Sequence, residues 1–143
     1  MSLLPSKGLL AIAAVIDVAL QAAGRPLSAK TLAARHGLPP RHLETVLQSL
    51  VRDGVLKGIR GPRGGYELAR EPGRVSVSDI LRAAGTTEEP NEGGGSALLA
   101  EVVVPALAAA ESEFGRALNR ITLEDLTRRA ESRASGDRAV ARR

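Results

Sequence analysis

Hydrophobic residues near the start of the chain recur every three or four positions, the spacing of a helix with one buried face. This pattern predicts a first helix from the N-cap residue Ser6 to about Ala23, with Gly24 after its last turn. Asp17 interrupts the apolar run, which favours a helix of a folded domain over a secretory signal peptide. No apolar run approaches the roughly 20 residues that a membrane span needs.

Two more helices with a short connection follow. Ser28 is the predicted N-cap of a short helix that ends before Gly37. Pro40 suits the first turn of a third helix, which continues to about Asp53 and ends at Gly54. A helix, a turn of about three residues and a second helix form a helix-turn-helix.

A β-hairpin is predicted directly after the third helix. Residues 55–59 and 66–68 alternate as strands, and the turn between them, residues 60–65, is dense in Gly and Pro. A hairpin in this position is a wing. Ser76 and Asp79 form a capping box that begins the next short helix.

The second half of the chain is different in character. Residues 85–96 are acidic and rich in Gly, which is typical of a flexible loop. Residues 97–133 predict a long helix, kinked at Pro105, and a terminal helix that begins with a second capping box at Thr122. Residues 134–143 are predicted to be a disordered tail.

One narrow face of the long helix is apolar. Its residues are separated by 4, 3, 4, 4 and 3 positions: Val103, Leu107, Ala110, Phe114, Leu118 and Ile121. This is the spacing of coiled-coil contacts, so we expect two copies of the chain to pair through it. The expected fold class is mostly α with a small β-hairpin wing. It consists of a winged helix-turn-helix over residues 1–84 plus a long dimerisation helix.

Composition narrows the chemistry. The chain of 143 residues has one Phe, one Tyr and no Trp, so its core must be aliphatic. The absence of cysteine excludes disulfides, thiolate metal ligands and a cysteine nucleophile, and it fits a cytoplasmic protein. The two histidines, His36 and His42, make a poor metal site, so none is expected. No catalytic motif is present, and we expect no enzymatic activity.

Positive charge is concentrated in the first part of the chain. Residues 1–84 hold 12 Lys/Arg and 6 Asp/Glu, whereas residues 85–143 hold 8 and 10. A basic first part is expected if that part contacts a polyanion, although a solvated basic surface is an equally simple explanation.

The third helix has two contrasting faces. At about 100° per residue, its apolar residues fall on one side and its polar residues on the other. Arginine can bind guanine, glutamine adenine, glutamate the cytosine amino group, and threonine a thymine methyl group. The predicted DNA contacts of this helix are Arg41, His42, Glu44, Thr45, Gln48 and Arg52. The alternative is an ordinary amphipathic helix with a solvated polar face.

The predicted wing carries further DNA contacts. Arg60 and Arg63 lie in a turn with three glycines, which lets the backbone approach a phosphate or the minor groove closely. Lys57 adds charge on the first strand. A basic wing directly after a helix-turn-helix supports DNA binding more strongly than either part alone.

The wing of the Rrf-two (Rrf2) family of bacterial regulators is similar to the run Arg60-Gly61-Pro62-Arg63-Gly64-Gly65-Tyr66-Glu67-Leu68. Residues 41–44, Arg-His-Leu-Glu, resemble the start of that family's recognition helix, and residues 75–83 resemble its next helix. The match in order and spacing covers about residues 5–130. The resemblance implies a homodimer built on the long helix, with Glu44 as the specificity-setting carboxylate and Arg60 as the minor-groove arginine.

The chain departs from the resemblance in two respects. Thr45 stands where many members have Gln, and Arg41 where many have Ser, so a different operator is expected. Many members bind an iron–sulfur cluster through three cysteines in the loop before the long helix. This chain has no cysteine, so no such cofactor is expected. The nature of any small-molecule effector stays open.

These observations favour a dimeric regulator of transcription that binds double-stranded DNA and acts as a repressor. The alternative is a winged-helix module that binds a partner protein, with weak and non-specific DNA binding. Substitution of Arg60 and Gln48 distinguishes the two, because only the first requires them.

Overall fold

The computed structural model of the chain describes residues 4–21, 25–85 and 96–141. The first helix ends at Leu20, before the predicted Ala23, because the backbone of its C-cap residue Gln21 is extended. The predicted Gly24 lies outside the described residues. So do most of the predicted acidic loop, residues 86–95, and the last two residues of the predicted tail.

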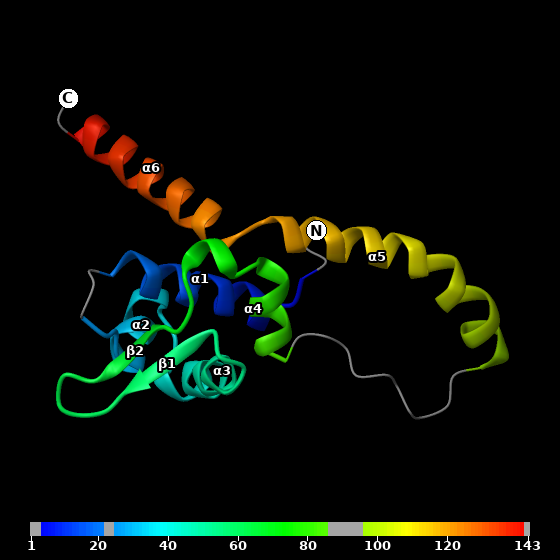
Figure 1. The fold of residues 1–143 in the computed structure, drawn as a ribbon, viewed down its shortest axis with the longest axis horizontal. Coiled ribbons are helices and arrows are strands. Elements are labelled where there is room, and N and C mark those ends of the chain that lie inside the picture. Colours follow the sequence, from blue (N-terminus) through cyan, green and yellow to red (C-terminus); the bar gives the residue numbers. More distant parts are fainter. Residues whose placement is uncertain (1–3, 22–24, 86–95, 142–143) are drawn as a thin grey trace.

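The winged helix-turn-helix forms the body of the molecule, and two helices extend from it (Figure 1). The β-hairpin is antiparallel, with Leu56 opposite Leu68 and Ile59 opposite Gly65. The predicted fold class is therefore confirmed. In chain order the elements are α1 (Ser6–Leu20), α2 (Ala29–His36), α3 (Pro40–Arg52), β1 (Leu56–Ile59), β2 (Gly65–Leu68), the 3₁₀ turn η1 (Pro72–Arg74), α4 (Val77–Ala83), the π-helical segment η2 (Leu99–Val103), α5 (Val104–Arg120) and α6 (Leu123–Ala141).

The core is aliphatic, as the composition predicts. α1 lies at its centre and packs against α3, α4, β2 and α6. The turn into α6 also contributes, because Leu123 is fully buried with the residues of the winged helix. The largest fully buried side chains are Leu32, Leu43, Leu47, Leu50, Leu56, Ile80, Leu123, Val15, Val55 and Val75.

Two further helix ends differ from the sequence-based expectation. Ser6 is the first residue of α1 and not its N-cap. Pro5 is the N-cap, since its backbone is extended and its carbonyl accepts hydrogen bonds from the backbone N–H groups of Gly8 and Leu9. The predicted disordered tail is also wrong up to Ala141, because α6 continues to that residue. Gly136 costs only about 1 kcal/mol relative to alanine in a helix, and no proline occurs in residues 123–141.

The disturbance predicted at Pro105 takes the form of a π-helical segment. Pro105 lacks the N–H that would bond to the carbonyl of Glu101, and η2 ends two residues before it. η2 and α5 together form one curved helix that extends away from the body (Figure 1).

Backbone hydrogen bonds hold the C-terminal end of α5 against the winged helix. The Val77 N–H donates to the Ile121 carbonyl at 2.8 Å, and the Leu123 N–H donates to the Val75 carbonyl at 2.7 Å. The predicted capping box at Thr122 is present, and the hydrogen bond to the Thr122 backbone N–H holds the pKa of Asp125 below its ordinary value. The direction of α5 is thus set by the winged helix.

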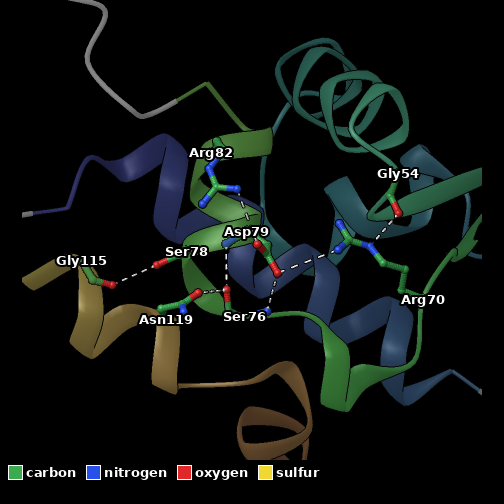
Figure 2. A network of polar contacts seen from close by, with 8 residues as sticks. All are labelled: Gly54, Arg70, Ser76, Ser78, Asp79, Arg82, Gly115 and Asn119. Atoms are coloured by element: carbon green, nitrogen blue, oxygen red, sulfur yellow. Dashed lines mark hydrogen bonds and ion pairs between the residues drawn. The ribbon is translucent and has the colours of Figure 1, made fainter.

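Polar side chains add to this junction (Figure 2). The Ser76 hydroxyl accepts from the Asp79 N–H in the predicted capping box and donates to the side-chain oxygen of Asn119 at 3.1 Å. The Ser78 hydroxyl donates to the Gly115 carbonyl at 3.2 Å. One turn of α4 therefore orients the last two turns of α5.

The wing is attached to the body through a close backbone approach. Tyr66 and Leu27 exchange two backbone hydrogen bonds, of 2.8 and 3.1 Å. A Cβ atom on Gly65 would lie 2.4 Å from the carbonyl carbon and oxygen of Leu27, so only glycine fits there.

We expect Gly65→Ala to separate the wing from Leu27 and to lower the free energy of unfolding by about 2–3 kcal/mol, since two backbone hydrogen bonds lose their geometry. Urea denaturation measures this loss. Gly58→Ala is the matched control, because nothing lies within 4 Å of a Cβ atom there. Equal stability of the two variants would contradict the assignment.

Candidate nucleic-acid interface

α3 places its predicted DNA contacts on one exposed face. Leu43, Val46, Leu47 and Leu50 are buried in the core. This fixes the rotation of α3, and the opposite side of the helix is presented to solvent. All six predicted contacts of α3 are exposed: Arg41, His42, Glu44, Thr45, Gln48 and Arg52.

α2 and the turn before α3 hold α3 in place. The Ser28 side chain caps α2 by accepting from the Thr31 N–H at 3.1 Å, as predicted. Gly37 ends α2 in the left-handed conformation with φ 63°, which favours glycine. His36 bonds through Nε2 to Oδ2 of Asp17 on α1 at 2.7 Å. His36 thus connects α1 and α2, and no group of three metal-ligand side chains is found among the described residues.

The wing and α3 lie on the same side of the body, away from α5 and α6 (Figure 1). Arg60 and Arg63 are exposed in the turn between the strands, and neither forms an ion pair with a described residue. Lys57 is also exposed, but its Nζ lies 3.7 Å from Oε2 of Glu67. Its charge is therefore partly offset within the hairpin, unlike that of the two arginines.

Arg70 has a structural role that its charge alone does not indicate (Figure 2). Its Nε donates to the Gly54 carbonyl at the end of α3 at 3.1 Å, and its Nη1 lies 3.9 Å from Oδ2 of Asp79. This side chain joins the end of the wing to the end of the recognition helix and to α4. Arg70 therefore helps to hold the wing, α3 and α4 in position relative to one another.

Tyr66 on the wing lies close enough to Glu44 on α3 for the charge of the carboxylate to affect the tyrosine. Burial raises the pKa of Tyr66 above its ordinary value of 10.0, and the nearby carboxylate of Glu44 raises it further. Because ionisation is easier in the unfolded chain, the stability that neutral Tyr66 contributes is present below pH 10 and is lost as pH rises through the folded pKa.

Titration of Tyr66 tests this placement of Glu44. The chain has one Tyr and no Trp, so the ultraviolet absorbance of tyrosinate reports on Tyr66 alone. We expect a midpoint above 10.0 that moves down in Glu44→Gln but stays raised, because burial is the larger cause. Glu71→Gln is the control. An unchanged midpoint in Glu44→Gln would place the carboxylate away from the wing.

The predicted apolar face of α5 divides into two parts. Val103, Leu107, Ala110 and Phe114 are exposed, and the exposed fraction of Leu107 is 59%. Leu118 and Ile121 are half-buried at the junction with the winged helix. Four large apolar side chains outside the predicted face are also exposed: Leu98, Leu99, Val102 and Val104. A single chain leaves this apolar surface uncovered.

The sequence matches the model of the Rrf2 family, described as an iron-dependent transcriptional regulator, over residues 4–129. The chain belongs to the Rrf2 family. Relatives within this family support the assignment. An HTH-type transcriptional regulator of Synechocystis sp. is 37% identical over 86% of each chain. The HTH-type transcriptional regulator IscR of Xenorhabdus nematophila is 32% identical over 94% of this chain and 85% of its own.

Solved structures agree with this assignment. The structure of T. potens IscR superposes with a TM-score of 0.71 at 32% identity, over 90% of this chain and 88% of the other. The B. subtilis global cysteine regulator CymR gives a TM-score of 0.66 at 29% identity, over 89% and 97%. This Rrf2 chain is a DNA-binding regulator of transcription and, like the relatives it matches, not an enzyme.

The family's description names iron, and the cysteine thiolates that hold iron–sulfur clusters are absent from this sequence. The chain has no cysteine, and no group of three potential metal ligands occurs in the described part. In the same part, no helix is long and apolar enough to cross a membrane.

Proposed function

We propose that this Rrf2 protein is a sequence-specific repressor that binds a two-fold operator as a homodimer. The observation that carries the proposal is the exposed polar face of α3, together with the basic turn of a wing that lies on the same side of the body. α3 supplies groups that bind base edges in a major groove, and Arg60 and Arg63 supply charge for the adjacent minor groove or backbone. A repressor of this kind acts by covering a promoter, in the cytoplasm where the DNA lies.

Pairing of two copies through α5 supports the two-fold operator. The exposed side chains of Val103, Leu107 and Phe114 give one face an apolar strip of coiled-coil spacing. Because α5 is fixed to α4 by the contacts of Ser76 and Ser78, pairing of two α5 helices also fixes the two recognition helices. Half-sites about 34 Å or a multiple of this apart are then required.

We propose further that regulation of this member does not use a thiolate-bound iron–sulfur cluster. The absence of cysteine supports this proposal, because thiolate-bound clusters need cysteine side chains as iron ligands. Its signal must reach the recognition helix by another route.

Fluorescence anisotropy tests the proposed function. The full chain is titrated onto duplex DNA from upstream of its own gene and onto a scrambled duplex, at two salt concentrations. We expect binding at least ~10³-fold tighter to the upstream DNA, with a strong salt dependence from counterion release. Equal and weak binding to both duplexes would contradict specific recognition and favour a module that binds a partner protein.

A further inference from the structure

A cavity of about 580 Å³ lies between the start of α1 and the start of the recognition helix α3. Leu10, Leu38 and Val46 form its apolar wall. Lys7, Arg41 and His42 also line it, and none of its described lining residues carries a carboxylate. Pockets of about 300–1,000 Å³ with apolar walls and a few convergent polar groups are typical small-molecule sites.

The positive charge in this cavity is not neutralised within the described part of the chain. Neither Lys7 nor Arg41 forms an ion pair there. A second cavity of similar size, about 570 Å³ between α4 and α5, is different. Its arginines already have partners: Arg82 lies 3.8 Å from Asp79, and Arg116 lies 3.0 Å from Glu113. Of these two cavities, the one beside α3 combines an apolar wall with cations that have no ion-pair partner among the described residues.

We propose that the cavity between α1 and α3 binds a small organic anion with an apolar body, and that this ligand is an effector that weakens DNA binding. The apolar wall would cover the body of the ligand, and Lys7 and Arg41 would hold its acidic group. The second part rests on the proposed function, because Arg41, His42 and Thr45 line the cavity and are also proposed DNA contacts. A ligand that engages Arg41 competes with DNA for it, and the coupling is reciprocal.

Two fluorescent probes that differ mainly by one charge test the cavity without DNA. One is 8-anilinonaphthalene-1-sulfonate (ANS), and the other is N-phenyl-1-naphthylamine, which has the same rings without the sulfonate. We expect the full chain to bind ANS about tenfold or more tightly than the neutral probe, a ratio that corresponds to the attraction of one or two partly exposed cations.

Single substitutions test whether the preference for ANS over the neutral probe arises in this cavity. Lys7→Glu is expected to weaken ANS binding at least about fivefold and to leave the neutral probe unchanged. Arg129→Glu, the same charge reversal on the exposed surface of α6, is expected to change neither. Ser6→Trp, at an exposed residue that lines the cavity without a capping role, is expected to weaken both probes by filling the opening. Equal affinity for the two probes, or equal effects of Lys7→Glu and Arg129→Glu, would overturn the site.

A further variant tests whether a second copy of the chain occupies the cavity. Leu107→Asp is expected to leave the preference for ANS unchanged, since Leu107 lies on α5. If the wild-type chain shows no preference and Leu107→Asp restores it, a partner chain fills the cavity and the ligand proposal fails.

Addition of ANS to the protein–DNA complex tests the coupling. We expect operator affinity to fall at least about fivefold at saturating ANS in the wild type and to stay unchanged in Ser6→Trp. Unchanged affinity in the wild type would overturn the effector role. If no specific DNA binding occurs under any condition while the probe preference is intact, the proposed function fails and the cavity stands as an anion site.

Discussion

Combined replacement of Gln48 and Arg60 by alanine is expected to lower operator affinity at least about 30-fold, since loss of each base contact costs about 1–3 kcal/mol. Gln48 is an exposed residue of α3, and Arg60 is an exposed residue of the wing. The two lie on separate elements without a shared partner, so their effects should be nearly additive. Because neither side chain contributes to the core, the free energy of unfolding should stay within about 0.5 kcal/mol of the wild type.

Comparison of the single variants shows which contact gives specificity. Gln48→Ala should relax discrimination at one base pair in each half-site, whereas Arg60→Ala should also reduce the dependence of affinity on salt. Anisotropy on the operator and on single-base variants of it measures both effects, with Arg129→Ala on α6 as the control for loss of positive charge. Wild-type affinity in the double variant, with an intact dimer, would contradict DNA recognition through this face.

The helices of the winged helix could be predicted because their capping residues and their pattern of apolar residues indicate the same helix ends. Ser28 and Gly37 bound α2 as predicted, and the Ser76 capping box begins α4. The start of α6 was predicted correctly from the capping box at Thr122. The end of α6 was predicted wrongly, because small and charged residues are typical of both a disordered tail and an exposed helix. Helix propensity is a weak signal where no packing supports it.

The exposed contacts of α3 could be predicted from helical periodicity, but the partners of charged side chains could not. Arg70 and Lys57 both add positive charge to the sequence near the wing. In the structure, Arg70 donates a hydrogen bond to Gly54 and forms an ion pair with Asp79. Lys57 forms an ion pair with Glu67. The pairing of Lys57 with Glu67 follows from the hairpin register, which places the two residues opposite each other. The contacts of Arg70 span sixteen residues or fewer, yet depend on how three elements pack together.

The site between α1 and α3 was not indicated by any local pattern. Lys7 reads in the sequence as an ordinary charge at the start of a helix, and Arg41 as a DNA contact. They line one cavity only because the start of α1 lies close to the start of α3 in the folded chain. Tertiary packing therefore brings an apolar wall together with cations that have no ion-pair partner in the described part of the chain, and sequence periodicity carries no information about this arrangement.

Leu107→Asp is expected to convert the protein to a monomer at micromolar concentration. The exposed fraction of Leu107 is 59% in a single chain, so the substitution should not disturb the fold of that chain. In the proposed dimer the same side chain is covered, and each copy would bring an unpaired carboxylate into an apolar interface, at a cost of about 3–5 kcal/mol. Light scattering measures the mass, and circular dichroism confirms the helix content.

The matched control is Ala109→Asp, the same introduced charge on an exposed position of α5 away from the predicted face. It should remain dimeric. Leu107→Asp should bind the full operator about 10²–10⁴-fold more weakly than the wild type, because linked half-sites bind with an effective concentration that a monomer lacks. On a single half-site the two proteins should bind equally. A Leu107→Asp protein that stays dimeric would place the interface elsewhere. A monomer with full operator affinity would show that the two recognition helices do not act together.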